Sequence, residues 1–247
     1  MEAILEKLGI ADYEFLTGII PSRFNFINPK KLKEALERLK SNPTKENKCE
    51  LMQTLEKEIR FLGSADIAYL IRYLFSKEPG VPFREIVNDV AKSLKISITK
   101  LGTDEELLKD IVEKYTTGRF QQLDREHQQQ LLRESGVSKE HAEDFVKQHT
   151  KNISIPLMIK LLGIKSVQKI VTDIVIATIS NYIGKNAATK LITEVMKKFP
   201  VWAEWVGPAM WAITIGWLVF DIQGPAKRKT TPIILYLGLC VIREENL

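Results

Sequence analysis

Cysteine and histidine are scarce in this 247-residue sequence, which contains two cysteines and three histidines. Cys49 and Cys240 lie far apart, and neither has a second cysteine or a histidine at metal-ligand spacing. This pattern argues against a disulfide framework, and we expect a reducing compartment. The N-terminal residues MEAILEKLGI also lack the basic start and apolar run of a signal peptide, so we expect no export by that route.

Motifs that carry catalysis are missing as well. The sequence has no glycine-rich phosphate loop, HExxH pair, GxSxG elbow or CxxC pair. The acidic run Asp104–Glu106 stands at an expected helix start, where the helix dipole favours carboxylates without any acid–base role. His141 and His149 are about two helical turns apart, but solvated histidines are the usual case in so polar a region. We therefore expect no enzyme, no metal and no cofactor, with a site assembled from distant residues left open.

Helical periodicity dominates residues 1–150. Apolar residues recur at spacings of three and four in NPKKLKEALERLK, CELMQTLEKEIRFLG, GSADIAYLIRYLF and PFREIVNDVAKSLKI. Thr103 and Glu106 are spaced for a capping box at the start of a further helix. Residues 123–149 predict a helix, a turn and a second helix capped by Ser138. That second helix lacks the basic face that phosphate contacts require, so nucleic acid is not the expected partner.

Residues 151–247 are both more apolar and more basic than the rest. They hold 12 lysine and arginine residues against 6 aspartate and glutamate residues, whereas residues 1–150 carry a net charge of −1. We expect two parts, a helical N-terminal part at 1–150 and a basic, apolar helical C-terminal part at 151–247. A segment that is both cationic and apolar favours an anionic membrane surface or an acidic protein partner over DNA.

Lysines interrupt the first apolar stretch of this C-terminal part at helical intervals. Lys160, Lys165 and Lys169 recur together with Asp173 in a stretch that is otherwise rich in Ile, Val and Leu. The spacing predicts a helix with a broad apolar face and a narrow polar strip. Such a helix either packs inside a bundle or lies in a membrane interface with its lysines at the headgroups.

A second stretch, Val201–Phe220, has about the length that a helix needs to cross the hydrocarbon core of a bilayer. It carries one charge, Glu204, and is flanked by basic residues on both sides. Its tryptophans lie near its ends and in its middle, as in an aromatic belt. The candidate membrane or partner contacts in and around this stretch are Trp202, Trp205, Trp211, Trp217, Lys227, Arg228 and Lys229.

Gly207-Pro208 can also break this stretch into pieces too short to span a bilayer. A second apolar run, PIILYLGLCVI, follows a basic turn and could pair with the first as an antiparallel hairpin. Three interpretations stay open: a transmembrane helix, a hairpin buried in a soluble bundle, and a hairpin that inserts conditionally or lies on a membrane surface.

Several segments together resemble the bacterial YaaW-like family of uncharacterised helical proteins. They are DYEFL, GSADIAYLIRYLFSKEPGVPFREIVNDVAKSLKI, TDEELLKDIVEKY, LDREHQQQLL and GPAKRKTTPIILYLGLCVI. The resemblance implies a cytoplasmic bacterial helical protein and supplies no catalytic residues. The middle of the chain is also similar to helical assembly chaperones of the cytochrome bc1 complex, which would imply a client membrane protein. Relatives are richer in Gly and Ala where Trp and Ile dominate here.

Taken together, the sequence predicts an all-α helical bundle with an apolar C-terminal helical hairpin. The leading hypothesis is a non-enzymatic, membrane-associated or partner-binding protein, such as a stress or defence effector whose hairpin engages lipid. The alternative is a soluble assembly chaperone or adaptor for a membrane-protein client. We expect a cytoplasmic location, with or without attachment to the inner membrane. So large an apolar patch is seldom left bare, which favours homo-oligomerisation.

Overall fold

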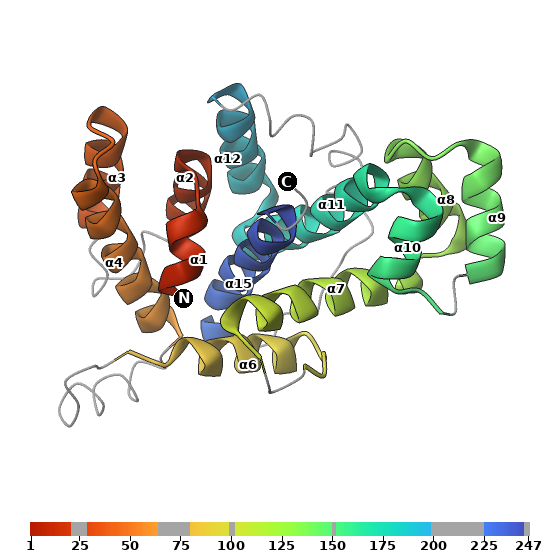
Figure 1. The fold of residues 1–247 in the computed structure, drawn as a ribbon, viewed down its shortest axis with the longest axis horizontal. Coiled ribbons are helices and arrows are strands. Elements are labelled where there is room, and N and C mark those ends of the chain that lie inside the picture. The colour runs from red at the N-terminus through yellow and green to blue at the C-terminus, as the bar shows by residue number, and fades with distance from the viewer. Residues whose placement is uncertain (21–28, 64–79, 99–101, 150–151, 199–224, 245–247) are drawn as a thin grey trace.

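The computed structural model describes residues 1–20, 29–63, 80–98, 102–149, 152–198 and 225–244. All regular elements within these residues are α-helices, which confirms the expected all-α class. Figure 1 shows the α3–α4 pair at one end of the molecule and α8, α9 and α10 at the other. The helices are α1 (Glu2–Lys7), α2 (Ile10–Ile19), α3 (Pro29–Ser41), α4 (Lys45–Leu62), α6 (Phe83–Ser93), α7 (Asp104–Gln122), α8 (Arg125–Glu134), α9 (Lys139–His149), α10 (Ile155–Leu162), α11 (Ile164–Ile183), α12 (Lys185–Lys198) and α15 (Pro225–Glu244).

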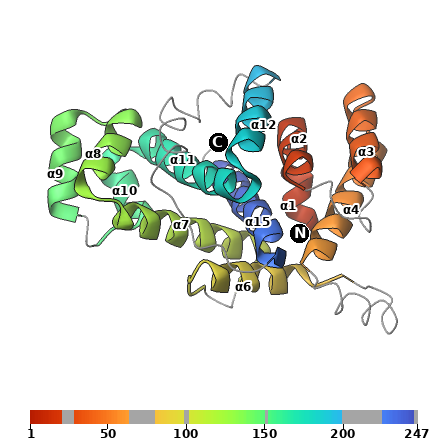
Figure 2. The same ribbon diagram turned by 180° about the vertical axis from the view of Figure 1, so that it is seen from behind.

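The last described helix, α15, lies in the middle of the fold. It packs against α2, α4, α6, α7 and α11, and Figures 1 and 2 show it in the middle of the molecule among these helices. All its residues from Thr230 to Ile242 are buried. A helix that is apolar around its whole circumference must be covered on every face, which explains this position. Helices from residues 1–150 and from residues 151–247 therefore share one hydrophobic core.

Local capping signals define several helix starts as the sequence predicts. The Thr103 hydroxyl accepts from the Glu106 backbone N–H, and the Glu106 carboxylate accepts from the Thr103 backbone N–H, closing the capping box at α7. Ser138 accepts from the His141 backbone N–H at the start of α9. These contacts satisfy backbone donors that have no partner inside the helix.

Two expectations for the C-terminal part differ from the structure. The basic turn expected at 227–229 is instead part of α15, because Pro225 suits a first helical position and the helix continues through Pro232. The lysine-bearing stretch is not one helix: Gly163, at φ +82°, ends α10 and precedes α11. Asp173 does not join an exposed polar strip, because it is buried inside α11.

A buried polar cluster connects α15 to α2. The Asp12 carboxylate accepts from the Tyr236 hydroxyl at 2.8 Å and from Arg243 Nη2 at 2.7 Å, and it also caps α2 by accepting from the Gly9 backbone N–H. The Tyr236 ring stacks on Phe15 with centroids 4.1 Å apart. Burial raises the pKa of Tyr236, so its hydroxyl stays protonated and donates. These contacts fix the position of α15 relative to α2.

Glycine permits the close approach of α15 to α7. A Cβ added at Gly238 would lie 2.5 Å from Val112 Cγ2 and 2.8 Å from the Leu108 carbonyl oxygen, which belongs to the backbone and cannot move cheaply. We expect Gly238→Ala to lower the free energy of unfolding by about 1–3 kcal/mol. Urea unfolding followed by circular dichroism measures the change. Gly118→Ala is the control: it meets nothing within 4 Å in the middle of α7 and should raise stability by about 0.5–1 kcal/mol.

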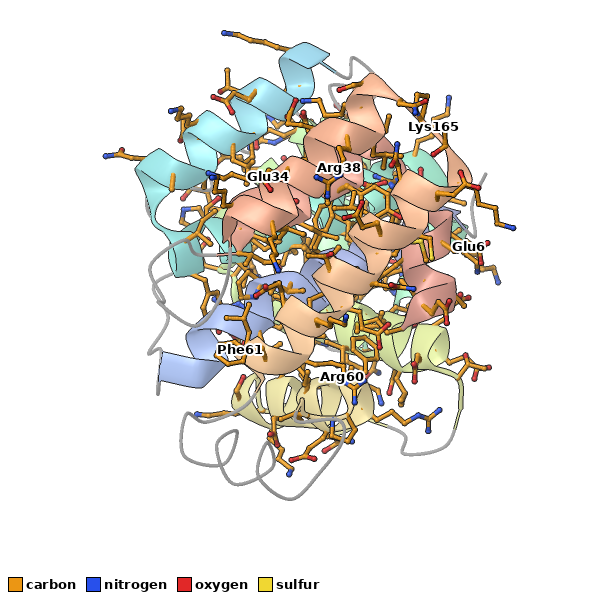
Figure 3. All side chains as sticks on the ribbon, turned by 90° about the vertical axis from the view of Figure 1, so that its left-hand side faces the viewer. Glu6, Glu34, Arg38, Arg60, Phe61 and Lys165 are labelled. Atoms are coloured by element: carbon orange, nitrogen blue, oxygen red, sulfur yellow. The ribbon has the colours of Figure 1, made fainter. Side chains whose placement is uncertain are left out.

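Breaking the Asp12 cluster should cost more than breaking an exposed ion pair. In Asp12→Asn the amide presents a donor where Arg243 needs an acceptor, and we expect a loss of about 3 kcal/mol of unfolding free energy. The matched control is Glu50→Gln, which breaks the solvent-exposed pair with Arg38 on the α3 surface and should cost less than about 1 kcal/mol. Arg38 is labelled in Figure 3. Equal losses in the two variants would contradict a structural role for the cluster.

Candidate functional site

The predicted contact lysines lie around the corner between α10 and α11. Lys160 and Lys165 are exposed and Lys169 is partly exposed, and Lys165 stands at the edge of the molecule in Figure 3. Between the first two lies Ile164, at 39% the one exposed large hydrophobic side chain in the described part of the chain. The corner thus exposes one apolar side chain and two cationic residues.

The three basic residues predicted at 227–229 are not gathered at this corner. Lys227, Arg228 and Lys229 belong to the first turns of α15, and Figure 1 shows that end of α15 beside α6, away from the α10–α11 corner. The four tryptophans, Trp202, Trp205, Trp211 and Trp217, fall outside the described residues, as does the first half of the expected hairpin. Among the helices that the structure describes, none combines the length and apolarity needed to cross a bilayer.

The histidines occupy separate positions. His127 Nδ1 lies 2.5 Å from the Asp124 carboxylate at the start of α8, where Asp124 also caps the helix. His149 packs its ring against Phe145 within α9. In the described ranges, no group of three or more potential ligands is placed to hold a metal ion.

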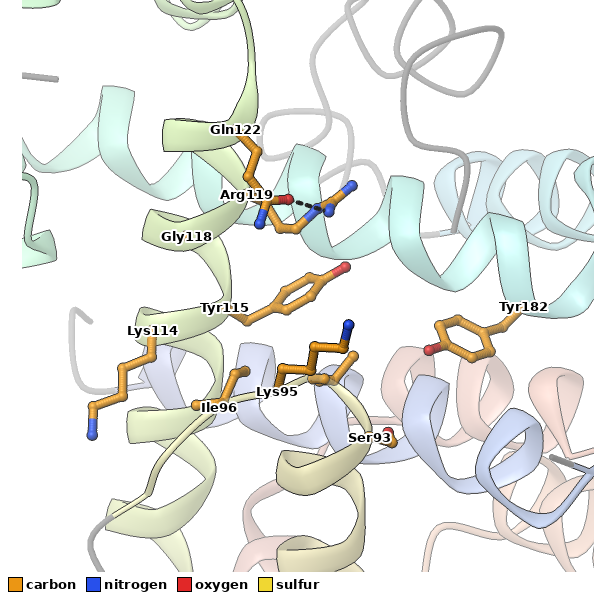
Figure 4. Close-up of a pocket in the computed structure, with 10 residues that line it drawn as sticks. Ser93, Lys95, Ile96, Lys114, Tyr115, Gly118, Arg119, Gln122 and Tyr182 are labelled. Carbon is orange, nitrogen blue, oxygen red and sulfur yellow. Dashed lines mark hydrogen bonds between the residues drawn. The ribbon is translucent and has the colours of Figure 1, made fainter. Parts of the chain in front are cut away.

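The structure reveals a pocket of about 420 Å³ that the sequence did not indicate. It lies between the end of α6, the following turn, α7 and the end of α11. Figure 4 shows the side chains of Lys95, Tyr115 and Arg119 on one side of α7. The lining residues are Ser93, Leu94, Lys95, Ile96, Lys114, Tyr115, Gly118, Arg119, Gln122 and Tyr182.

The lining of this pocket is cationic and contains no acidic residue. Lys114 is engaged elsewhere, because its ammonium donates to Asp110 and to the Ser97 carbonyl and points to the far side of α7 in Figure 4. Arg119 donates to the Gln122 side-chain oxygen, and burial lowers its pKa because desolvation disfavours the charged form. Arginine nevertheless stays protonated at neutral pH. Two cations, Lys95 and Arg119, therefore face the pocket.

Two tyrosines form the polar inner wall. The Tyr115 hydroxyl lies 2.8 Å from Thr178 Oγ1, and because Thr178 donates to the Ile174 carbonyl, Tyr115 is the donor. Tyr182 shares a hydrogen bond with Thr231 of the central helix α15. Burial raises the pKa of both tyrosines, so both are neutral near physiological pH. This wall contributes hydroxyl groups but no negative charge.

Lys95 adopts an unusual backbone conformation at the pocket. Its φ is +58°, the one positive φ of a non-glycine residue in the described part of the chain. It follows α6 in a Schellman-type end, in which the Ile96 N–H donates to the Ala91 carbonyl and the Lys95 N–H to that of Lys92. Glycine is the usual residue here, because an L side chain is strained in this region.

Sequence reasoning missed this pocket for an identifiable reason. Its residues come from three elements that are distant in the chain, and none forms a motif. The one usable signal was negative: the segment VAKSLKISI ends a helix without glycine, whereas helices very commonly end with one. A lysine stands at this position instead, in the left-handed backbone conformation that glycine adopts without strain.

One curated relative is similar to most of the chain. A UPF0174 protein of Helicobacter pylori strain J99 is 25% identical over 196 residues, which cover 78% of this chain and 72% of that protein. Its name specifies no activity, ligand or partner. No family model and no solved structure matches the chain. The similarity supports kinship with an uncharacterised protein family, and the assignment to the YaaW-like family stays a prediction.

The strain at Lys95 can be measured directly. We expect Lys95→Gly to be more stable than Lys95→Ala by about 1 kcal/mol, because only glycine relieves the left-handed backbone while both variants remove the ammonium group. Chemical unfolding of the two variants side by side gives the difference. Equal stabilities would show that the turn carries no such strain.

Proposed function

We propose that this protein is a non-enzymatic, membrane-associated helical protein that contacts anionic lipid through its Val201–Phe220 run. The supporting observation is the anchoring of the helices on either side of this run. α12 packs against α2 and α11, and α15 forms the centre of the core. The helices that precede and follow the Val201–Phe220 run therefore belong to the same helical bundle.

The burial of α15 supports assigning lipid contact to the first half of the expected hairpin. The run PIILYLGLCVI belongs to α15 and is covered on all sides by other helices. Exposing it to lipid would give up the core and the Asp12 cluster, a cost comparable to the whole stability of a domain. We therefore assign lipid contact to Val201–Phe220 and a structural role to α15.

Surface charge supports attachment to an anionic leaflet. Residues 151–247 carry an excess of six positive charges, and each lysine or arginine near an anionic membrane contributes about 1 kcal/mol. Lys160 and Lys165 beside the exposed Ile164 offer a second contact of the same kind at the α10–α11 corner. Tryptophan favours the interface between headgroups and acyl chains.

Flotation of the full-length protein with vesicles of phosphatidylcholine and phosphatidylglycerol tests the proposal. Wild type should rise with the vesicles, and Trp211→Glu should stay behind, because a charge at this position opposes burial in lipid. Gln148→Glu, which adds the same charge on the exposed surface of α9, should float like wild type. Circular dichroism establishes that both variants are folded.

Each result of this experiment is informative. Flotation that survives high salt indicates apolar insertion, and flotation that is lost at high salt indicates electrostatic attachment. A wild-type protein that never floats, or a Trp211→Glu variant that floats fully, would contradict the proposal. The first of these would favour the chaperone or adaptor alternative.

A further inference from the structure

We propose that the pocket between α6, α7 and α11 binds a small phosphate monoester, with Lys95 and Arg119 holding the phosphate. This inference is independent of membrane attachment, because it rests on a different part of the chain. Its evidence is the charge of the lining, the shape of the pocket and the backbone at Lys95.

Charge is the first line of evidence. The Lys95 ammonium has no hydrogen-bond or ion-pair partner within the described residues, and none of the lining side chains is acidic. Arg119 is half-buried and so has lost part of its hydration. An anion bound in the pocket would replace that hydration and give the Lys95 ammonium a counter-charge.

The donor set favours phosphate over carboxylate. A phosphate monoester presents three terminal oxygens and up to two negative charges at neutral pH. Lys95 supplies a compact ammonium and Arg119 a planar fork of N–H donors, and both kinds of group bind phosphate oxygens in proteins. The amide of Gln122 is a further donor, because its oxygen already accepts from Arg119. A carboxylate would be satisfied by Arg119 alone.

Shape limits the size and character of the ligand. A volume of about 420 Å³ lies within the range of small-molecule pockets. Leu94, Ile96 and the ring of Tyr182 supply apolar surface next to the two cations. Gly118 leaves space on the α7 side, because an added Cβ there would meet nothing within 4 Å. The pocket therefore suits a phosphate attached to a compact apolar or aromatic group.

The backbone at Lys95 is the independent second observation. A lysine at a position that favours glycine costs stability, and strain of this kind tends to accompany functional positions. The turn places Lys95, which is an exposed residue, among the residues that line the pocket (Figure 4). We interpret the strain as the cost of placing this ammonium in the pocket.

Phosphorus NMR titration of phenyl phosphate with the full-length protein tests the proposal. Each charge-assisted hydrogen bond is worth roughly one to two powers of ten in affinity, so we expect a Kd on the order of 1 mM or below. Lys95→Gly should weaken binding about tenfold or more while leaving the protein folded. Gly118→Leu should abolish binding by filling the pocket, and Gly118→Ala should retain most of it.

Two further arms identify the source of the phosphate. If vesicles containing phosphatidic acid float Trp211→Glu but not the double variant Trp211→Glu/Gly118→Leu, the phosphate belongs to a lipid headgroup. If phenyl phosphate binds and Gly118→Leu leaves vesicle flotation unchanged, the ligand is a free phosphate ester. Both outcomes support the pocket, and neither depends on whether wild type inserts its tryptophans.

Three results would overturn the proposal. The first is the absence of phenyl phosphate binding at millimolar concentration. The second is unchanged binding in both Lys95→Gly and Gly118→Leu, which would place the ligand elsewhere on the surface. The third is equally tight binding of benzoate, which would remove the preference for phosphate. Failure of Trp211→Glu to lose flotation bears on the membrane proposal alone.

Discussion

The burial of α15 is the constraint on which the rest of the structure depends. The segment Pro232–Ile242 of this helix is apolar around its circumference, so helices from both parts of the chain pack around it. Its buried polar groups then need partners within the protein. Asp12 supplies one for Tyr236 and Arg243, and Tyr182 supplies one for Thr231. The absence of a side chain at Gly238 lets α7 approach closely enough to close the core.

Local signals made much of the helical part predictable, whereas long-range packing was not. The capping box of Thr103 and Glu106 and the cap at Ser138 depend on residues three positions apart, so the sequence alone identifies them. The central position of α15 depends on five other helices, and no local pattern reveals it. Asp173 shows the same limit: its spacing suggested an exposed strip, but neighbouring helices cover it.

The candidate site illustrates a second limit of sequence reasoning. The lysines at 160 and 165 were identifiable because they interrupt an apolar run, and the structure places them at an exposed corner. The pocket has no such contrast, because Lys95 and Arg119 lie in polar segments where cations are ordinary. Their importance arises from the turn after α6, whose hydrogen bonds and positive φ bring Lys95 to the side of α7 that bears Arg119.

The pocket and the central helix share a wall, and this has a thermodynamic consequence. Tyr182 lines the pocket and hydrogen-bonds to Thr231, which lies in the first half of α15, the helix that follows the tryptophan-bearing run. A ligand that contacts Tyr182 therefore also touches the environment of α15, the helix that follows the Val201–Phe220 run in the chain. If ligand binding changes the affinity for lipid by some factor, lipid must change the affinity for the ligand by the same factor. A ligand whose contacts are identical in the free and attached forms would change neither. The hydrogen bond between Tyr182 and Thr231 is therefore one contact that joins the pocket lining to the helix following the Val201–Phe220 run.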